Sequence, residues 1–122
     1  MPLSNSLANY KNHVIIAGFG FNGRNLARVL METGIKYIVI ELNPETIRQE
    51  KKKGENIIFG DVTRKEILQQ TSIGAALVFV IAISDPASSR RALVLAKELN
   101  PHIYIIVRTR YTSEIESLIA LG

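Results

Sequence analysis

Short apolar runs alternate along the chain with longer segments in which apolar residues recur every three or four positions. The short runs predict strands at residues 13–17, 36–41, 56–59, 77–83 and 103–107. The longer segments predict helices at about residues 22–33, 43–54, from 63 onward, 85–99 and near 115–121. Because each strand is followed by a helix, the pattern is typical of a parallel sheet covered on both faces. Right-handed crossovers then favour a Rossmann-like, doubly wound α/β sheet in three layers (α/β/α), with strand order 3-2-1-4-5.

Polar residues mark where several of these helices begin. Asn43 and Asp85 each precede a proline, which suits the start of a helix. Two further pairs have the spacing of a capping box, namely Thr63 with Glu66 and Ser113 with Glu116. The run at 77–83 shows no polar alternation, so we expect a central strand that is covered on both faces.

The pattern accounts for one domain. We expect residues 12–122 to form it and residues 1–11 to be a linker or tail, and we expect a sixth strand to follow the last helix. The chain has 122 residues, 47% hydrophobic and 21% charged, which is typical of a soluble globular domain and not of a disordered chain. The absence of cysteine excludes a disulfide scaffold. The longest apolar run, 75–83, is far shorter than the roughly 20 residues that cross a bilayer, so we predict no membrane insertion.

The charge balance does not indicate a nucleic-acid partner. Fifteen basic and eleven acidic residues give a formal net charge of +4. The basic residues are spread along the chain, and the run 51–53 suits a solvated helix end. No helix-turn-helix, zinc-ligand or aromatic stacking motif accompanies them.

A glycine-rich motif, G-F-G-F-N-G, occupies residues 18–23. It follows the first predicted strand and opens the first helix, which is the setting in which this motif binds a nucleotide. Gly18 suits a tight turn, Gly20 lets a phosphate approach the backbone, and Gly23 lets the helix pack closely on the strand. The helix N-terminus adds free N–H groups and the positive end of the helix dipole. We therefore expect a phosphate at this motif.

An acidic residue, Glu41, ends the second predicted strand, 23 residues after Gly18. A carboxylate at that position accepts hydrogen bonds from both ribose hydroxyls and repels a 2′-phosphate, which disfavours NADP. The alternative interpretation is an exposed strand-end residue without a ligand. The neighbouring Leu42 belongs to the same candidate site.

Three further loops begin at the same predicted edge of the sheet. After the third strand, Asp61 either accepts from an adenine amino group or caps the turn before Thr63. After the fourth strand, residues 82–84 are placed to form the floor of the phosphate and sugar site, although packing alone explains the two apolar ones equally well. After the fifth, Arg108 and Arg110 either clamp a phosphate or carboxylate or pair with surface acids.

Residues that would support turnover are missing from the pattern. There is no thiol, and His13 and His102 fall at strand starts, the edge away from the predicted nucleotide. No paired carboxylates and no metal-ligand cluster appear, and five strand–helix units leave no room for a region that holds a substrate against a cofactor. The sequence therefore predicts a binding domain and not an enzyme, with no catalytic residue and no metal site.

Besides the shared glycine motif, two short runs are more particular, G-D-V-T at 60–63 and S-D-P at 84–86. With them, residues 12–122 resemble the nucleotide-binding lobe of the regulator-of-potassium-conductance domains, also called the TrkA-N domain. The nearest variety is the cytoplasmic tail of monovalent cation:proton antiporters of the glutathione-gated potassium-efflux type. The resemblance implies a regulatory domain on the cytoplasmic side of the plasma membrane, partnered by a membrane transporter domain and assembled as a homodimer.

The resemblance also implies the ligand, an adenine nucleotide. The expected contacts are Gly18, Phe19, Gly20, Phe21, Asn22, Gly23, Glu41, Leu42, Asp61, Val62, Ala82, Ile83 and Arg108. Many members carry an arginine after the second glycine, where this chain has Phe21, which argues against a tight pyrophosphate clamp. We therefore expect AMP, with NAD(H) next. The alternatives are the cofactor-binding half of an NAD-dependent oxidoreductase and a redox-sensing DNA-binding regulator, which would need a winged helix that this sequence lacks.

Overall fold

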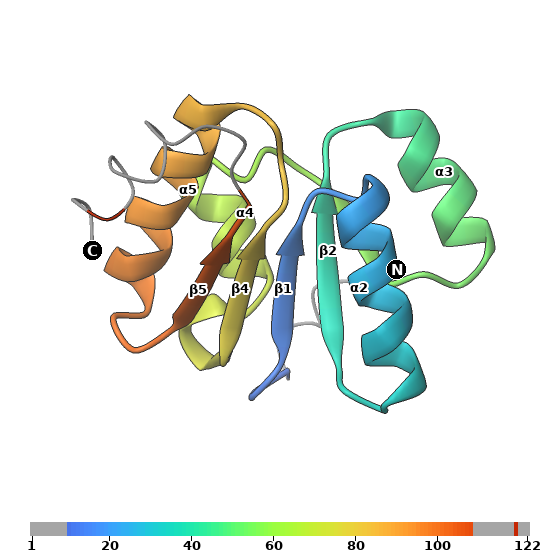
Figure 1. Ribbon diagram of the computed structural model, residues 1–122, viewed down its shortest axis with the longest axis horizontal. Coiled ribbons are helices and arrows are strands. Elements are labelled where there is room, and N and C mark those ends of the chain that lie inside the picture. The colour runs from blue at the N-terminus through green and yellow to red at the C-terminus, as the bar shows by residue number, and fades with distance from the viewer. Residues whose placement is uncertain (1–9, 109–118, 120–122) are drawn as a thin grey trace.

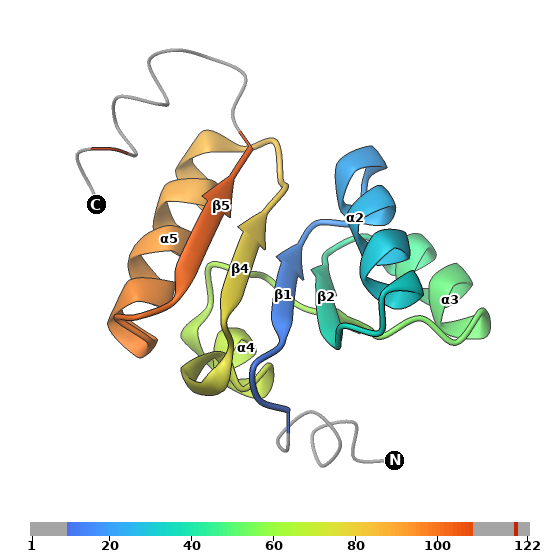
Figure 2. The ribbon, with the colours of Figure 1, turned by 60° about the horizontal axis from the view of Figure 1, so that its bottom comes forward.

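The computed structural model describes residues 10–108 and residue 119. Its centre is one sheet of five parallel strands in the order β3-β2-β1-β4-β5, and the labelled arrows point the same way in Figure 1 and Figure 2. The strands are β1 (Val14–Ala17), β2 (Tyr37–Glu41), β3 (Ile57–Phe59), β4 (Val78–Ile81) and β5 (Tyr104–Val107). The predicted doubly wound sheet and its strand order are therefore confirmed.

Helices flank both faces of this sheet. They are α2 (Phe21–Glu32), α3 (Pro44–Lys52), α4 (Lys65–Gln70) and α5 (Pro86–Leu99), with a 3-10 turn η1 (Ile73–Ala75). In Figure 1, α2 and α3 lie beside β2, and α4 and α5 lie beside β4 and β5. Alternate strand residues point to opposite faces, so Ile16 and Val39 join the core under α2 and α3, whereas Ile15 and Phe79 join the core under α4 and α5. This arrangement confirms the three predicted layers.

Side chains cap the first turns of α3 and α5, as the sequence predicts. The Oδ1 atom of Asn43 accepts hydrogen bonds from the N–H groups of Glu45 and Thr46, at 2.9 and 3.1 Å. The Oδ2 atom of Asp85 accepts from the N–H and the hydroxyl of Ser88, at 3.1 and 2.6 Å. Each carboxylate or amide oxygen thus satisfies N–H groups that have no partner within the helix.

The capping box predicted at the start of α4 is wrong. The helix begins at Lys65, and its N-cap residue Arg64 makes no side-chain hydrogen bond to the helix. The N–H and the hydroxyl of Thr63 both donate to Oδ1 of Asp61, at 2.9 and 2.7 Å. The Thr63 side chain is therefore tied to the preceding turn, because a carboxylate two residues upstream competes for it.

The expected coverage of β4 on both faces is only partly found. Phe79 and Ile81 are buried on the side of α4 and α5, whereas Val78 and Val80 on the other side are half-buried. Next to them on β5, Tyr104 is 67% exposed. The helices α2 and α3 pack on β1, β2 and β3, so within the described residues they leave the β4–β5 half of that face partly open.

Some predictions fall outside the described residues. They are the last helix apart from residue 119, the capping box of Ser113 and Glu116, the role of Arg110, and residues 1–9 of the linker. The division into a linker at 1–11 and a domain at 12–122 stays a prediction. In the part of the chain that the structure describes, no helix combines the length and hydrophobicity that a membrane span needs.

Candidate functional site

The carboxyl ends of β1, β2 and β4 meet at one edge of the sheet and form a crevice. Ala17 pairs in register with Ile40 and Ile81, so the three strands reach this edge together. Two cavities adjoin there, a helix-side cavity of about 450 Å³ at the start of α2 and a loop-side cavity of about 160 Å³ at residues 60–62. The residues that line both cavities are Gly18, Glu41, Ile83 and Ser84.

The residues predicted from the sequence converge on this crevice. The helix-side cavity is lined by the glycine-rich loop, the start of α2 and the segments after β4 and β5, with Phe19, Gly20, Phe21, Asn22, Ala82 and Arg108 among its residues. The loop-side cavity is lined by others, among them Leu42, Asp61 and Val62. Gly23 is the exception because it lines neither cavity.

The three glycines of the motif differ in what they do. Gly18 has a φ of +100°, and a Cβ there would lie 2.8 Å from the carbonyl oxygen of Ala82 on the neighbouring strand end. A Cβ on Gly23 would lie 2.1 Å from the carbonyl oxygen of Gly18, so this glycine lets α2 pack against the loop. A Cβ on Gly20 would meet nothing within 4 Å. Gly18 and Gly23 therefore serve the fold, whereas Gly20 leaves the backbone open toward the cavity.

The start of α2 brings backbone amides to the helix-side cavity. Its N-cap residue is Gly20, which has no side chain that could cap the helix, and the first turn holds no acidic residue. The first N–H groups of a helix lack partners within the helix, and the helix dipole is positive at this end. Arg108, which follows β5, adds a guanidinium to the same cavity. This end of the crevice suits an anionic group such as a phosphate.

Backbone donors hold the carboxylate of Glu41 where the two cavities meet. Its Oε1 atom accepts a hydrogen bond from the N–H of Phe19 at 2.8 Å. Its Oε2 atom accepts from the N–H groups of Leu42 and Asn43, both at 2.9 Å. A carboxylate offers about four acceptor positions, so capacity remains for a further donor. The bonds from Leu42 and Asn43 are local, whereas the bond from Phe19 arises because β1 and β2 end side by side, and the sequence gives no signal for it.

The loop-side cavity combines apolar walls with one acid. Its apolar walls include Ile40, Val62 and Ile83, which suit a flat ring. Asp61 caps the turn before Thr63, one of the two roles that the sequence left open, and the two hydrogen bonds from Thr63 hold the pKa of the Asp61 carboxyl below its usual value.

The two histidines lie away from the crevice, as the sequence predicts. His13 is fully buried at the amino end of β1, and its Nε2 atom donates to the carbonyl oxygen of Thr71 at 2.7 Å. Burial lowers the pKa of His13. His102 is exposed and lines neither cavity. Within the described residues, no group of three or more His, Cys, Asp or Glu side chains could hold a metal ion.

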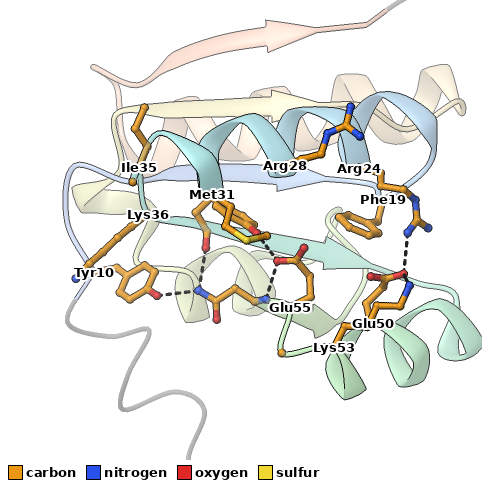
Figure 3. Close-up of a pocket in the computed structure, with 14 residues that line it drawn as sticks. Tyr10, Phe19, Arg24, Arg28, Met31, Ile35, Lys36, Glu50, Lys53 and Glu55 are labelled. Atoms are coloured by element: carbon orange, nitrogen blue, oxygen red, sulfur yellow. Dashed lines mark hydrogen bonds and ion pairs between the residues drawn. The ribbon is translucent and has the colours of Figure 1, made fainter.

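Sequence reasoning missed a second hollow, a groove of about 600 Å³ between α2 and α3, which we call the α2–α3 groove (Figure 3). Nη1 of Arg24 donates to Oε2 of Glu50 across it at 2.7 Å. Glu50 is only 5% exposed, and the hydrogen bond from Arg24 holds the pKa of its carboxyl below the usual value. Among the residues predicted for the site, Phe19 alone also lines this groove. The two partners are 26 residues apart, and no local pattern predicts such a pair.

Comparison with known proteins gives one family. The model of the TrkA-N domain matches residues 14–122. The chain is 37% identical over 97 residues to the glutathione-regulated potassium-efflux system protein KefC of Escherichia fergusonii. That match covers 80% of this chain but 16% of KefC, so the chain spans a small part of the length of its curated relatives.

Solved structures show the same fold. The TrkA-N domain of the inner membrane protein ybaL from Escherichia coli superposes with a TM-score of 0.88 at 24% identity, covering 93% of this chain and 84% of that one. The structure described as the Shewanella denitrificans Kef CTD in AMP bound form gives a TM-score of 0.80 at 28% identity, covering 91% of this chain and 66% of that one.

Proposed function

The chain belongs to the TrkA-N domain family, and we propose that it is the nucleotide-binding regulatory domain of a transporter for potassium or another monovalent cation, with AMP as its ligand. One observation carries the proposal. In the crevice, an anion-binding helix start and an apolar cavity meet at a carboxylate, Glu41, that the backbone holds in place. These three features suit the phosphate, the base and the sugar of one nucleotide.

The proposed pose follows the two cavities. The adenine ring enters the loop-side cavity between Leu42, Val62 and Ile83. One ribose hydroxyl donates to Oε1 of Glu41, which accepts one hydrogen bond already, and the 5′-phosphate lies at the first turn of α2, near Arg108. In this pose the adenine amino group donates to Asp61.

The charge of the crevice favours AMP over larger nucleotides. Arg108 is the one cationic side chain among the described residues that line the two cavities, and Phe21 at the start of α2 adds no charge. A monophosphate needs less positive charge around it than a diphosphate or triphosphate. A Kef domain that is 28% identical was solved with AMP, which agrees with this choice. The second candidate is NAD(H), because the helix-side cavity has a volume of about 450 Å³ and is also lined by Ser84, in the loop after β4.

The relatives support a regulatory role without turnover. KefC is a potassium-efflux system protein, and the ybaL domain belongs to an inner membrane protein. We infer that this chain works on the cytoplasmic side of the membrane, pairs with a second copy, and changes transport when a nucleotide binds. A ligand shifts such an equilibrium only through its different affinity for the two states.

Binding is tested by calorimetry and thermal unfolding of the 122-residue chain with AMP, ADP, ATP, NAD and NADH. A ligand at a hundredfold excess over its Kd stabilises the fold by about 2.7 kcal/mol, so the shift with AMP should be clear and the largest of the five. The variant Glu41→Ala should lose it. The matched control Glu45→Ala removes an exposed carboxylate on α3 that lines neither cavity and should respond as the native chain does. No shift with any of the five nucleotides would refute the proposal.

Two measurements separate the regulatory role from the alternative of an oxidoreductase half. Cation flux through the full-length transporter should respond to AMP, and Glu41→Ala should abolish the response while leaving transport itself intact. A strong preference of the chain for NAD(H) over AMP, together with a flux that ignores the nucleotide, would favour the oxidoreductase.

A further inference from the structure

Phe19 belongs to both hollows of the molecule. Its backbone is part of the glycine-rich loop, and its N–H donates to the Glu41 carboxylate at 2.8 Å. Its ring is only 4% exposed and packs in the core with Ala27 and Leu30 of α2. Figure 3 shows Phe19 beside Arg24 in the α2–α3 groove. Contacts that hold the Phe19 ring in place therefore also hold its backbone N–H, which donates to Glu41.

Arg24 makes such a contact with the ring, although Arg24 does not line the crevice. Its guanidinium carbon lies 4.6 Å from the centre of the Phe19 ring, within the range of a cation–π contact. Its Nη1 atom donates to the buried Glu50, and its backbone N–H donates to the carbonyl oxygen of Gly20 at 2.9 Å. Lys53 lies 3.5 Å from the same Glu50 oxygen. Arg24 thus joins α3 to two residues of the glycine-rich loop.

The bond from Phe19 differs from the other two bonds to Glu41. Leu42 and Asn43 follow Glu41 directly in the chain, so their N–H groups hold Oε2 from its own loop. Phe19 lies 22 residues away, and its N–H alone among the three ties the carboxylate to the loop that receives the phosphate. If the loop relaxes, Oε1 loses this donor and can turn away from the sugar, while Leu42 and Asn43 still hold Oε2.

We propose that Arg24 is a positioning residue for ribose recognition, acting through Phe19 on Glu41. The inference rests on the proposed function, since it concerns the affinity of the same crevice for the nucleotide sugar. The ion pair of Arg24 with Glu50 holds the guanidinium over the ring, the ring holds the loop, and the loop N–H orients Glu41. A change in the α2–α3 groove therefore alters how well the crevice distinguishes a sugar with hydroxyls from one without.

The test compares AMP with 2′,3′-dideoxy-AMP by calorimetry. A hydrogen bond to a charged group is worth about tenfold or more in affinity, so the native chain should prefer AMP by at least about tenfold. Arg24→Met keeps an apolar chain over the ring but removes the charge and the ion pair. It should weaken AMP about tenfold and leave the dideoxy compound nearly unchanged. Arg28→Met, one turn along the same groove, is the matched control and should keep the native ratio.

Two further variants test whether Arg24 acts through the Phe19 ring. Arg24→Lys retains a cation and should give an intermediate ratio, which also serves if Arg24→Met proves too unstable to assay. In a Phe19→Leu background, Arg24→Met should cause little additional loss, because the ring through which it acts is gone. The inference is overturned if Arg24→Met weakens both nucleotides equally, if it changes neither, or if the two substitutions are additive. Failure of the native chain to bind AMP would instead refute the proposed function, and this inference with it.

Discussion

The carboxylate of Glu41 lies 2.8 Å from the backbone nitrogen of Phe19, across the gap between the end of β2 and the glycine-rich loop. Two sequence signals that lie 22 residues apart are thus joined by one hydrogen bond. The pairing of β1 with β2 brings them together, because Gly18 continues the ladder by donating to the carbonyl oxygen of Ile40 at 2.8 Å. The loop and the acid therefore act as a single structural unit at the mouth of the crevice.

The glycines of the motif should separate folding from binding. Gly23→Ala places a Cβ 2.1 Å from the carbonyl oxygen of Gly18, and we expect it to lower the free energy of unfolding by about 3 kcal/mol or more. Gly20→Ala meets no neighbour, so we expect a loss of about 1 kcal/mol or less, together with a fall in AMP affinity of about tenfold, since the methyl group occupies the phosphate approach. Urea unfolding and calorimetry measure the two effects. Equal stability of the two variants would contradict this division of roles.

Phe21 should control the response to additional phosphate charge. Its ring is 81% exposed at the start of α2 and lines the helix-side cavity. Phe21→Arg adds a guanidinium there, and we expect ADP affinity to rise about tenfold or more, with a smaller gain for AMP. Phe21→Gln, which adds polarity without charge, is the control and should leave the ratio of ADP to AMP affinity unchanged. A gain that is equal for both nucleotides would argue that residue 21 does not face the second phosphate.

Most of the fold could be predicted because the signals are local. Apolar runs bounded by glycine predict each strand end to within two residues. The caps at Asn43 and Asp85 depend on neighbours two or three residues away. Where two local signals compete, the prediction fails. The Thr63 hydroxyl donates to Asp61 and not to the helix, and a sequence pattern cannot rank these two partners.

Only the part of the candidate site that follows from the strand topology could be predicted. Parallel strands place their carboxyl ends together, so Gly18, Glu41 and Ile83 were expected at one edge. The pair of Arg24 and Glu50 depends on how α2 and α3 lie against each other, which no local spacing encodes. The half-open face of β4 could not be predicted either, because an apolar run predicts burial without saying what covers it.

The buried carboxylate of Glu50 should make the free energy of unfolding depend on pH in the acid range. The hydrogen bond from Arg24 holds the pKa of Glu50 below its usual value near 4.5. The stabilisation is therefore complete above about pH 4.5 and is lost as the pH falls through the lower pKa of the folded state. We expect Glu50→Gln to lower the free energy of unfolding by about 1–2 kcal/mol at pH 7 and to converge with the native chain in acid. Glu45→Gln removes an exposed partner of Arg48 and should change little.

His13 should make the fold sensitive to mild acid. The side chain is fully buried, and burial lowers its pKa below the usual 6.5. The unfolded chain then takes up a proton near pH 6.5 that the folded chain does not, so the free energy of unfolding should fall below that pH by up to about 1.4 kcal/mol per unit. His13→Gln cannot titrate and still offers an N–H to the carbonyl oxygen of Thr71, so urea unfolding between pH 8 and 5 should show a flatter profile. His102→Gln, at an exposed position, should keep the native profile. A native curve that stays level down to pH 5 would mean that the buried ring accepts its proton without cost.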